Sequence, residues 1–156
     1  MRNSTIKLIL IVAVLPFIIC SCARDSGNNP SASKIVAAVR NAAAFSDPRE
    51  ESLLDRETAE RYGISLSSVR DGIVYYDAGP ESADKIIIVT ASGKDGAEKV
   101  ERALESEKTR LTDALEDDKE QRGKTDGIVV KTRGFYCILI LSQNVREIER
   151  IFDGMT

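Results

Sequence analysis

Four short segments rich in β-branched and aromatic residues, paired on either side of one long charged segment, most constrain the fold of this chain. The first pair is Gly72–Tyr76 and Lys85–Thr90, with a loop at Gly79–Pro80 between them. The second pair is 126–131 and 135–141, joined by a turn that contains a glycine. Because short turns of this kind join antiparallel neighbours, each pair predicts a β-hairpin.

Apolar residues at helical spacing predict helices in the rest of the chain. The expected helices lie between Lys34 and Phe45, from about Asp55 to Tyr62, from about Gly96 to Asp118, and from Asn144 to Met155. The order is therefore α-α-β-β-α-β-β-α. Two hairpins around a long helix favour an α+β fold, with a four-stranded, largely antiparallel sheet and helices packed on one face.

The long helix has one narrow apolar stripe, and its other faces are almost wholly charged. The stripe consists of Ala97, Val100, Leu104, Leu111, Ala114 and Leu115. Glu107 and Lys108 interrupt it, so packing on a sheet is favoured over the alternative of a coiled coil. Asp95 with Glu98 resembles a capping box at its start, and Asn144 with Glu147 resembles one in the last helix.

The N-terminal 21 residues have the features of a secretory leader. Arg2 and Lys7 are their only charged residues, and Leu8 to Ile19 is an apolar run interrupted only by Pro16. A run of this length is too short for a bilayer span, which needs about 20 residues. We therefore predict a signal peptide over residues 1–21, with an uncleaved signal anchor as the alternative.

The sequence Ile19-Cys20-Ser21-Cys22 follows this apolar run and matches a bacterial lipoprotein processing site. A small residue before the cysteine suits the peptidase, and the thiol of Cys22 accepts the lipid. Cys20 is the weaker candidate, because the bulky Ile19 precedes it. We predict a lipid on Cys22, an extracytoplasmic position at the cell membrane, a flexible tether over residues 22–33, and a single α+β domain over 34–156.

Charge and cysteine content narrow the function classes. The full chain has a formal charge of −3, and loss of residues 1–21 removes two basic residues and no acidic one, leaving −5. An acidic surface argues against nucleic acid as a partner and against a broad contact with an anionic membrane, because both require clustered Lys and Arg. With Cys22 lipidated, Cys137 is the remaining thiol, so no internal disulfide is expected. Its place in an aliphatic strand predicts a buried core cysteine.

No catalytic, metal or cofactor site is predicted. The chain has no histidine, no G-x-G-x-x-G and no P-loop, which removes Ser-His-Asp, Cys-His and His-based zinc chemistry. The densest acidic patch is Glu116, Asp117, Asp118 and Glu120. It is interpreted as a solvated helix end, with Ca²⁺ binding as the alternative, because it lacks the alternating ligands and glycine of a calcium loop.

The first hairpin is the predicted binding surface. Tyr75 and Tyr76 alternate along a strand, so one is expected in the core and the other facing outward. The outward tyrosine, together with Gly79 and Pro80, would offer an exposed aromatic beside a loop. Ordinary packing of both tyrosines is the alternative.

Several segments resemble the uncharacterised bacterial lipoproteins of domain-of-unknown-function family 4358. They are the leader with its lipobox, Glu60-Arg61-Tyr62-Gly63-Ile64, the hairpin from Gly72 to Ala91, the long charged helix, and Arg133-Gly134-Phe135-Tyr136. The resemblance extends over nearly all of Lys34 to Phe152 and departs from the family pattern between Asp117 and Gly127. It implies a lipoprotein, mainly of Gram-positive anaerobes, with no established activity.

Three functions remain open at this stage. The favoured one is a non-catalytic binding or accessory module for a membrane or cell-envelope complex, with an envelope protein or a surface polymer as its partner. The alternative is a carboxylate-dependent enzyme that acts on cell-wall or surface polymers, for which two facing carboxylates in a cleft would be required. The third is a purely structural subunit of a membrane complex, which would show an exposed apolar patch.

Overall fold

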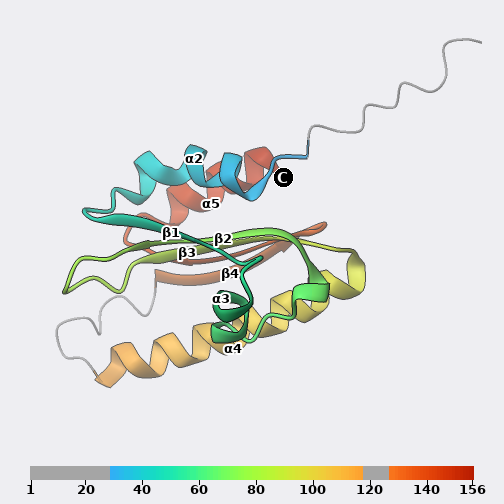
Figure 1. Cartoon of the computed structure of the whole chain (residues 1–156). Coiled ribbons are helices and arrows are strands. Elements are labelled where there is room, and N and C mark those ends of the chain that lie inside the picture. The colour runs from blue at the N-terminus through green and yellow to red at the C-terminus, as the bar shows by residue number, and fades with distance from the viewer. Residues whose placement is uncertain (1–28, 118–126) are drawn as a thin grey trace, which may run out of the picture.

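The computed structural model describes residues 29–117 and 127–156, and Figure 1 shows how their elements are arranged. The elements are α2 (Ala32–Ala43), β1 (Pro48–Ser52), α3 (Arg56–Arg61), the short 3-10 helix η2 (Leu66–Ser68), β2 (Val69–Asp77), β3 (Lys85–Ala91), α4 (Lys94–Asp117), β4 (Ile128–Arg133), β5 (Tyr136–Leu141) and α5 (Val145–Met155). The predicted signal peptide, Cys22 and most of the predicted tether lie outside the described residues. α2 begins at Ala32, two residues before the predicted domain boundary.

The sheet has five strands in the order β1-β2-β3-β5-β4, and every neighbouring pair is antiparallel. Both predicted hairpins are confirmed, but the prediction of four strands was wrong. The fifth strand is β1, whose sequence Pro-Arg-Glu-Glu-Ser carries no apolar pattern. It lies at the edge of the sheet, where charged side chains are tolerated and protect against pairing with another chain.

Charged side chains of β1 form ion pairs on both faces of the sheet. Glu50 pairs with Arg40 of α2 at 2.5 Å, and Glu51 pairs with Arg61 of α3 at 2.7 Å. These two neighbouring carboxylates reach helices on opposite sides of the sheet, as the alternation of side chains along a strand requires. The backbone pairing with β2 holds the strand, and charged residues occupy positions where apolar residues would be expected.

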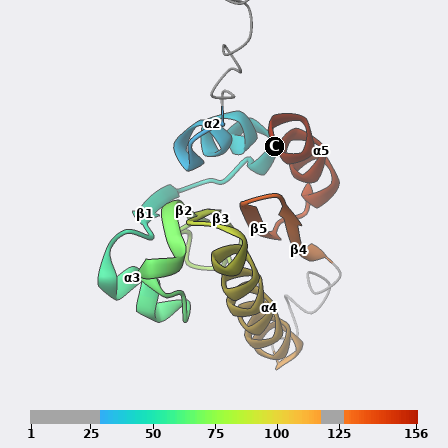
Figure 2. The same ribbon diagram turned by 90° about the vertical axis from the view of Figure 1, so that its right-hand side faces the viewer.

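Helices cover both faces of the sheet, so the prediction of helices on one face was also wrong. Figures 1 and 2 show α2 and α5 on one side and α3 and α4 on the other. Along β3, Ile86 and Ile88 belong to the core formed with α2 and α5, whereas Ile87 and Val89 belong to the core formed with α4. A central strand that is apolar at every position needs a helical layer on each side.

Local signals set the ends of several elements. The Ser31 hydroxyl accepts from Lys34 N, and the Asp55 carboxylate accepts from Thr58 N, so both are side-chain N-caps. Gly63 follows α3 with φ +64°, and Gly134 begins the β4–β5 turn with φ +58°. The two predicted capping boxes are absent. Asp95 lies inside α4, which begins one residue earlier, and Asn144 makes no side-chain cap bond and instead donates to Ala42 O at 2.9 Å.

The long helix packs against the sheet through the predicted stripe, but two of its residues differ from the prediction. Ala114 is exposed, whereas Glu107 is buried in line with Leu104 and Leu111. The face that packs on the sheet therefore contains a charged residue. In the described ranges, no helix combines the length and the apolar character that crossing a membrane requires.

Candidate functional site

The tip of the β2–β3 hairpin is the predicted binding surface. The hairpin closes where Asp77 N donates to Asp84 O at 3.0 Å, and Ser82 N donates to Gly79 O at 3.0 Å within the loop. A further bond from Ala78 N to Asp47 O at 2.9 Å joins the loop to the segment before β1. Backbone bonds thus connect two segments that are about thirty residues apart in sequence.

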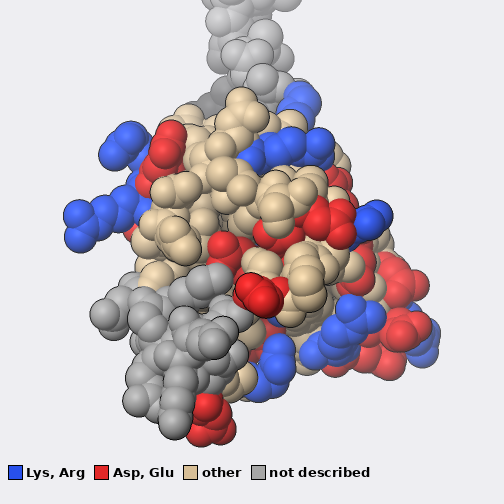
Figure 3. Space-filling model, turned by 90° about the vertical axis from the view of Figure 1, so that its left-hand side faces the viewer, with Lys and Arg blue, Asp and Glu red and all other residues tan. Residues whose placement is uncertain are grey.

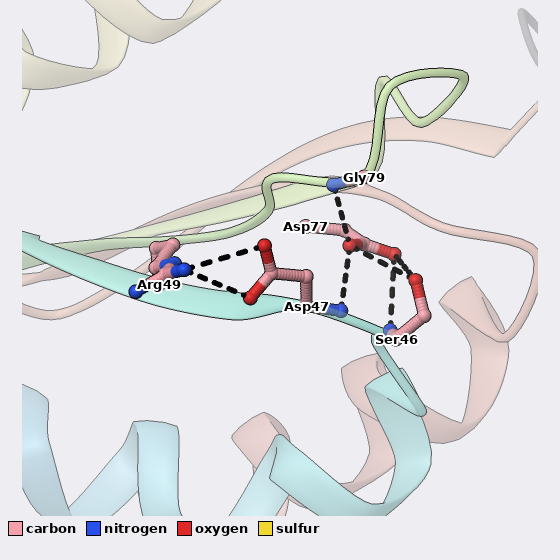
Figure 4. Close-up of polar contacts among 5 residues, drawn as sticks. All are labelled: Ser46, Asp47, Arg49, Asp77 and Gly79. Atoms are coloured by element: carbon pink, nitrogen blue, oxygen red, sulfur yellow. Dashed lines mark hydrogen bonds and ion pairs between the residues drawn. The ribbon is translucent and has the colours of Figure 1, made fainter.

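The side chain of Asp77 is the centre of this arrangement (Figure 4). Its carboxylate accepts from the backbone N–H groups of Asp47 at 2.9 Å, Gly79 at 3.0 Å and Ser46 at 3.1 Å. The Ser46 hydroxyl donates to the same group at 3.0 Å. These donors favour the ionised form and hold the pKa of Asp77 far below its usual value. One carboxylate therefore holds both the hairpin loop and the α2–β1 connection in a single conformation.

A shallow hollow of about 300 Å³ lies at this tip, lined by Ser46, Gly79, Pro80, Glu81 and Ser82. Figure 3 views the molecule from this end and shows acidic side chains near the middle of the face, among uncharged atoms. Residues 77–84 contain three acidic residues and no Lys or Arg. The predicted loop residues Gly79 and Pro80 thus form part of a rigid, acidic, open surface.

The two tyrosines do not lie on this surface together. They point to opposite faces of β2, as predicted, but both faces are covered. Tyr75 is 1% exposed and stacks on Phe45 with ring centroids 4.8 Å apart, and burial raises its pKa. Tyr76 is half-buried, and its hydroxyl donates to Glu51 at 3.0 Å. The outward-facing tyrosine that was expected is therefore engaged in an internal hydrogen bond.

A second polar cluster lies under α4, and sequence reasoning did not identify it. The Glu107 side chain is 4% exposed, and its carboxylate lies 3.6 Å from the Lys85 ammonium group. Arg110 donates to both Glu107 oxygens, at 2.7 and 2.8 Å. The Lys85 ammonium group also lies 5.4 Å from the centre of the Tyr62 ring. Desolvation lowers the pKa of Lys85, and the neighbouring Glu107 opposes that shift.

This cluster is internally satisfied, because every charge in it has an opposite charge or an aromatic face beside it. The cluster joins α4 to β3 through charges that are paired within the domain. The signal in the sequence was the break in the apolar stripe at Glu107, three residues after Leu104 and four before Leu111. That spacing places Glu107 on the packed face.

The remaining candidate groups are Cys137 and the acidic patch at the end of α4. Cys137 is fully buried, as predicted, and its thiol pKa is raised by burial. In residues 29–117 and 127–156, no three Cys, Asp or Glu side chains are grouped so that they could hold a metal ion. Glu116 and Asp117 are exposed in the last turn of α4, while Asp118 and Glu120 lie outside the described residues.

Three carboxylates of the described residues have pKa values that are lowered, not raised. A glycosidase-type general acid needs a pKa raised toward neutrality. Hydrogen bonds instead lower the pKa of Asp55, Asp77 and Asp153, so these groups stay ionised. They act as caps and as partners of Lys131 and Arg133.

The chain belongs to the family described as Domain of unknown function (DUF4358), which matches residues 43–142. The matched range includes all five strands, α3 and α4, but only the last residue of α2 and none of α5. No curated protein and no solved structure matches this chain. The resemblance noted in the sequence is therefore confirmed at the level of the family.

Proposed function

We propose that this protein is a lipid-anchored extracytoplasmic binding or accessory module of a membrane or cell-envelope complex, and that it contacts its partner through the hairpin tip. The hairpin tip is defined as Ser46, Gly79, Pro80, Glu81 and Ser82. The observation that carries the proposal is the set of bonds to Asp77, which fixes an exposed loop in one shape (Figure 4). A loop that is ordered before binding loses less conformational entropy when a partner docks.

The shape of the hollow favours a docking surface over an enclosed site. A volume of about 300 Å³ is at the lower limit for small-molecule pockets, which range over about 300–1,000 Å³. The hollow is also lined by an exposed proline and a half-exposed glycine. It fits one protruding side chain or one unit of a polymer.

The position of the tip suits a module that is tethered at its N-terminus. Ala32, the first residue of α2, donates to Asp71 near the beginning of β2, whereas the tip follows the other end of that strand. Six residues of strand, from Asp71 to Asp77, separate the two ends by about 20 Å. The tip therefore faces away from the point at which the chain enters the domain (Figure 1).

The charge of the tip indicates the chemistry of its partner. Glu81 in the tip, with Asp77 and Asp84 in the same loop, favours a basic protein segment or a polymer that carries amino or hydroxyl groups. A tether of about ten residues has a typical span of about 15–20 Å. That span restricts the partners to components of the same membrane or to polymers close to it.

The anchor is tested by mass spectrometry of the protein extracted from membranes. We expect a new N-terminus at Cys22 that carries the mass of a diacylglycerol, and we expect the Cys22→Ala variant to be lost from the processed pool. An intact, unacylated chain that begins at Met1 as the main membrane species would contradict the anchor.

The surface is tested by placing a photo-crosslinking residue at Pro80 of the full chain and, as a matched control, at Glu101 on the exposed face of α4. The proposal requires crosslinks to an envelope component from position 80 and none from position 101. Equal crosslinking at the two positions would refute the hairpin tip as the contact surface. Turnover of peptidoglycan or ester substrates by the purified protein would favour the enzyme alternative.

A further inference from the structure

The end of the domain at which the chain enters exposes different kinds of side chain from the hairpin tip. The bond from Ala32 N to Asp71 at 2.7 Å places this entry point beside the first residues of β2. In the antiparallel sheet the same end contains the end of β1, the end of β3 and the β4–β5 turn. We define the entry end as Leu54, Arg70, Lys94, Phe135 and Arg133, which follow the order of the strands across the sheet.

Both exposed large apolar side chains of the described residues lie at the entry end. Leu54, which follows β1, is 53% exposed, and Phe135, which precedes β5, is 46% exposed. Three strand spacings separate them, or about 14 Å. A single exposed apolar residue is unremarkable, but two at one end of a small domain form a pair of contact points.

The backbone holds Phe135 rigidly at its turn. Arg133 pairs with Tyr136 across the hairpin, so the turn contains only Gly134 and Phe135. Gly134 supplies the positive φ that such a tight turn needs, and Phe135 O accepts from Ala91 N at 2.7 Å. The backbone of Phe135 is thus held in place while its ring is exposed to solvent.

Basic side chains lie between these two apolar residues. Arg70 and Lys94 are exposed, and neither forms an ion pair within the described residues. The acidic residues nearby have partners within the domain: the Asp71 carboxylate accepts from Ala32 N and the Asp55 carboxylate from Thr58 N, and both remain charged, whereas Asp153 is paired with Lys131 and Arg133. Asp95, in the first turn of α4, is the exposed exception. At the opposite end, residues 77–84 contain acidic residues and no basic ones.

The short segment between Cys22 and the domain keeps the entry end close to the bilayer. Seven residues separate Cys22 from Asn29, the first described residue, and a fully extended chain of that length spans at most about 25 Å. α4 alone, with its 24 residues, is about 36 Å long. A lipid on Cys22 therefore lies within about 25 Å of Asn29, which is less than the length of α4.

We propose that the entry end rests on the lipid bilayer, with Phe135 and Leu54 in the headgroup region and Arg70 and Lys94 directed at anionic lipid headgroups. Apolar rings flanked by basic side chains are the combination that binds at such an interface. The proposal rests on the proposed lipid at Cys22 and adds an orientation, because it makes the domain lie against the membrane with the hairpin tip outward. Figure 2 views the molecule from the end that would contact the lipid.

The absence of tryptophan from the chain allows a direct test. Phe135→Trp is introduced into the full, acylated protein, which is reconstituted into phosphatidylglycerol vesicles with brominated acyl chains. We expect a blue shift and a loss of tryptophan emission relative to unbrominated vesicles. Pro80→Trp, at the opposite end, is the matched control and is expected to keep its emission. Adding Arg70→Glu and Lys94→Glu to the Phe135→Trp protein should reduce the quenching.

The outcomes separate the orientation from the anchor. Unquenched emission at position 135 in a protein that carries acyl mass and floats with the vesicles would overturn the orientation and leave the anchor intact. A blue shift without bromine quenching would show that a protein, either a second copy or another partner, covers this end, and would also overturn it. A protein without acyl mass would overturn both.

Discussion

Glu107 of α4 and Lys85 of β3 form an ion pair, with 3.6 Å between the carboxylate and the ammonium group, inside the layer where the helix packs on the sheet. Both side chains are largely removed from solvent, at 4% and 17% exposure. Arg110 and the Tyr62 ring complete their surroundings. A buried pair of this kind costs desolvation energy that its partners must offset, so removing one member is worse than removing both.

We expect Glu107→Leu to lower the free energy of unfolding by about 3 kcal/mol, because it leaves Lys85 buried without a counter-charge. Urea denaturation followed by far-ultraviolet circular dichroism measures the change. The double variant Glu107→Leu, Lys85→Met should recover most of the loss, since apolar residues of similar volume replace the pair.

Glu105→Gln, on the exposed face of the same helix, is the control and should change the unfolding free energy by less than about 0.5 kcal/mol. A loss below about 1 kcal/mol for Glu107→Leu would mean that Lys85 reaches water without difficulty. The ion pair would then have no structural role.

The helices and hairpins followed from local patterns, and the features that did not follow depend on distant partners. The break at Glu107 was visible in the sequence, but its partner Lys85 comes from another strand, and the pairing depends on how α4 crosses the sheet. In the same way, Asp77 is an unremarkable loop residue until the fold brings Ser46 and Asp47 to it. Sequence spacing contains no information about such contacts.

The two errors in the fold have different causes. β1 consists of polar residues whose partners, Arg40 and Arg61, lie on helices, so no apolar alternation marks it as a strand. The second helical layer, in contrast, could have been inferred. β5 is buried at all six positions, and an uninterrupted aliphatic run of this kind requires cover on both faces.

Gly96 in α4 is expected to reject a methyl group. An added Cβ would lie 2.9 Å from Ser68 O and 2.9 Å from the Ser92 hydroxyl oxygen, so the helix start and η2 would have to separate. Gly96→Ala should therefore destabilise the protein by about 1–3 kcal/mol, although alanine favours helices by about 1 kcal/mol. A thermal unfolding curve shows directly whether the substitution lowers or raises the stability.

Gly154 in α5 is the matched control, because nothing lies within 4 Å of a Cβ built there. Gly154→Ala should be neutral or stabilise the protein by up to about 1 kcal/mol. Stabilisation by both substitutions would show that the contact between α4 and η2 is looser than the geometry indicates.

Acid should weaken the hairpin tip through Asp77. The folded state lowers the pKa of Asp77 below the unfolded value of 3.8, so the stabilisation is complete well above that pH and is lost as the pH falls below it. We expect the unfolding free energy of the wild type to decline below about pH 4 and that of Asp77→Asn to decline less steeply. Urea midpoints across this range are the measurement.

Asp113→Asn, on the exposed face of α4, is the control and should leave the acid slope of the wild type unchanged. Asp55 and Asp153 also have lowered pKa values, so Asp77→Asn should retain part of the slope. An acid slope identical to that of the wild type would mean that the bonds to Asp77 do not stabilise the fold.

Cys137 should react with thiol reagents only when the protein unfolds. Its side chain is fully buried, its sulfur lies 3.7 Å from Ala97 O, and burial raises its pKa, so the reactive thiolate is disfavoured. In a Cys20→Ser, Cys22→Ser chain, native labelling should be slower than labelling in urea by about 10³-fold or more, because only about 10⁻³ or less of the native protein is unfolded at any time. Adding Ser106→Cys, on the exposed face of α4, provides a thiol that should react at once. Labelling of Cys137 at a comparable native rate would mean that β5 opens locally without global unfolding.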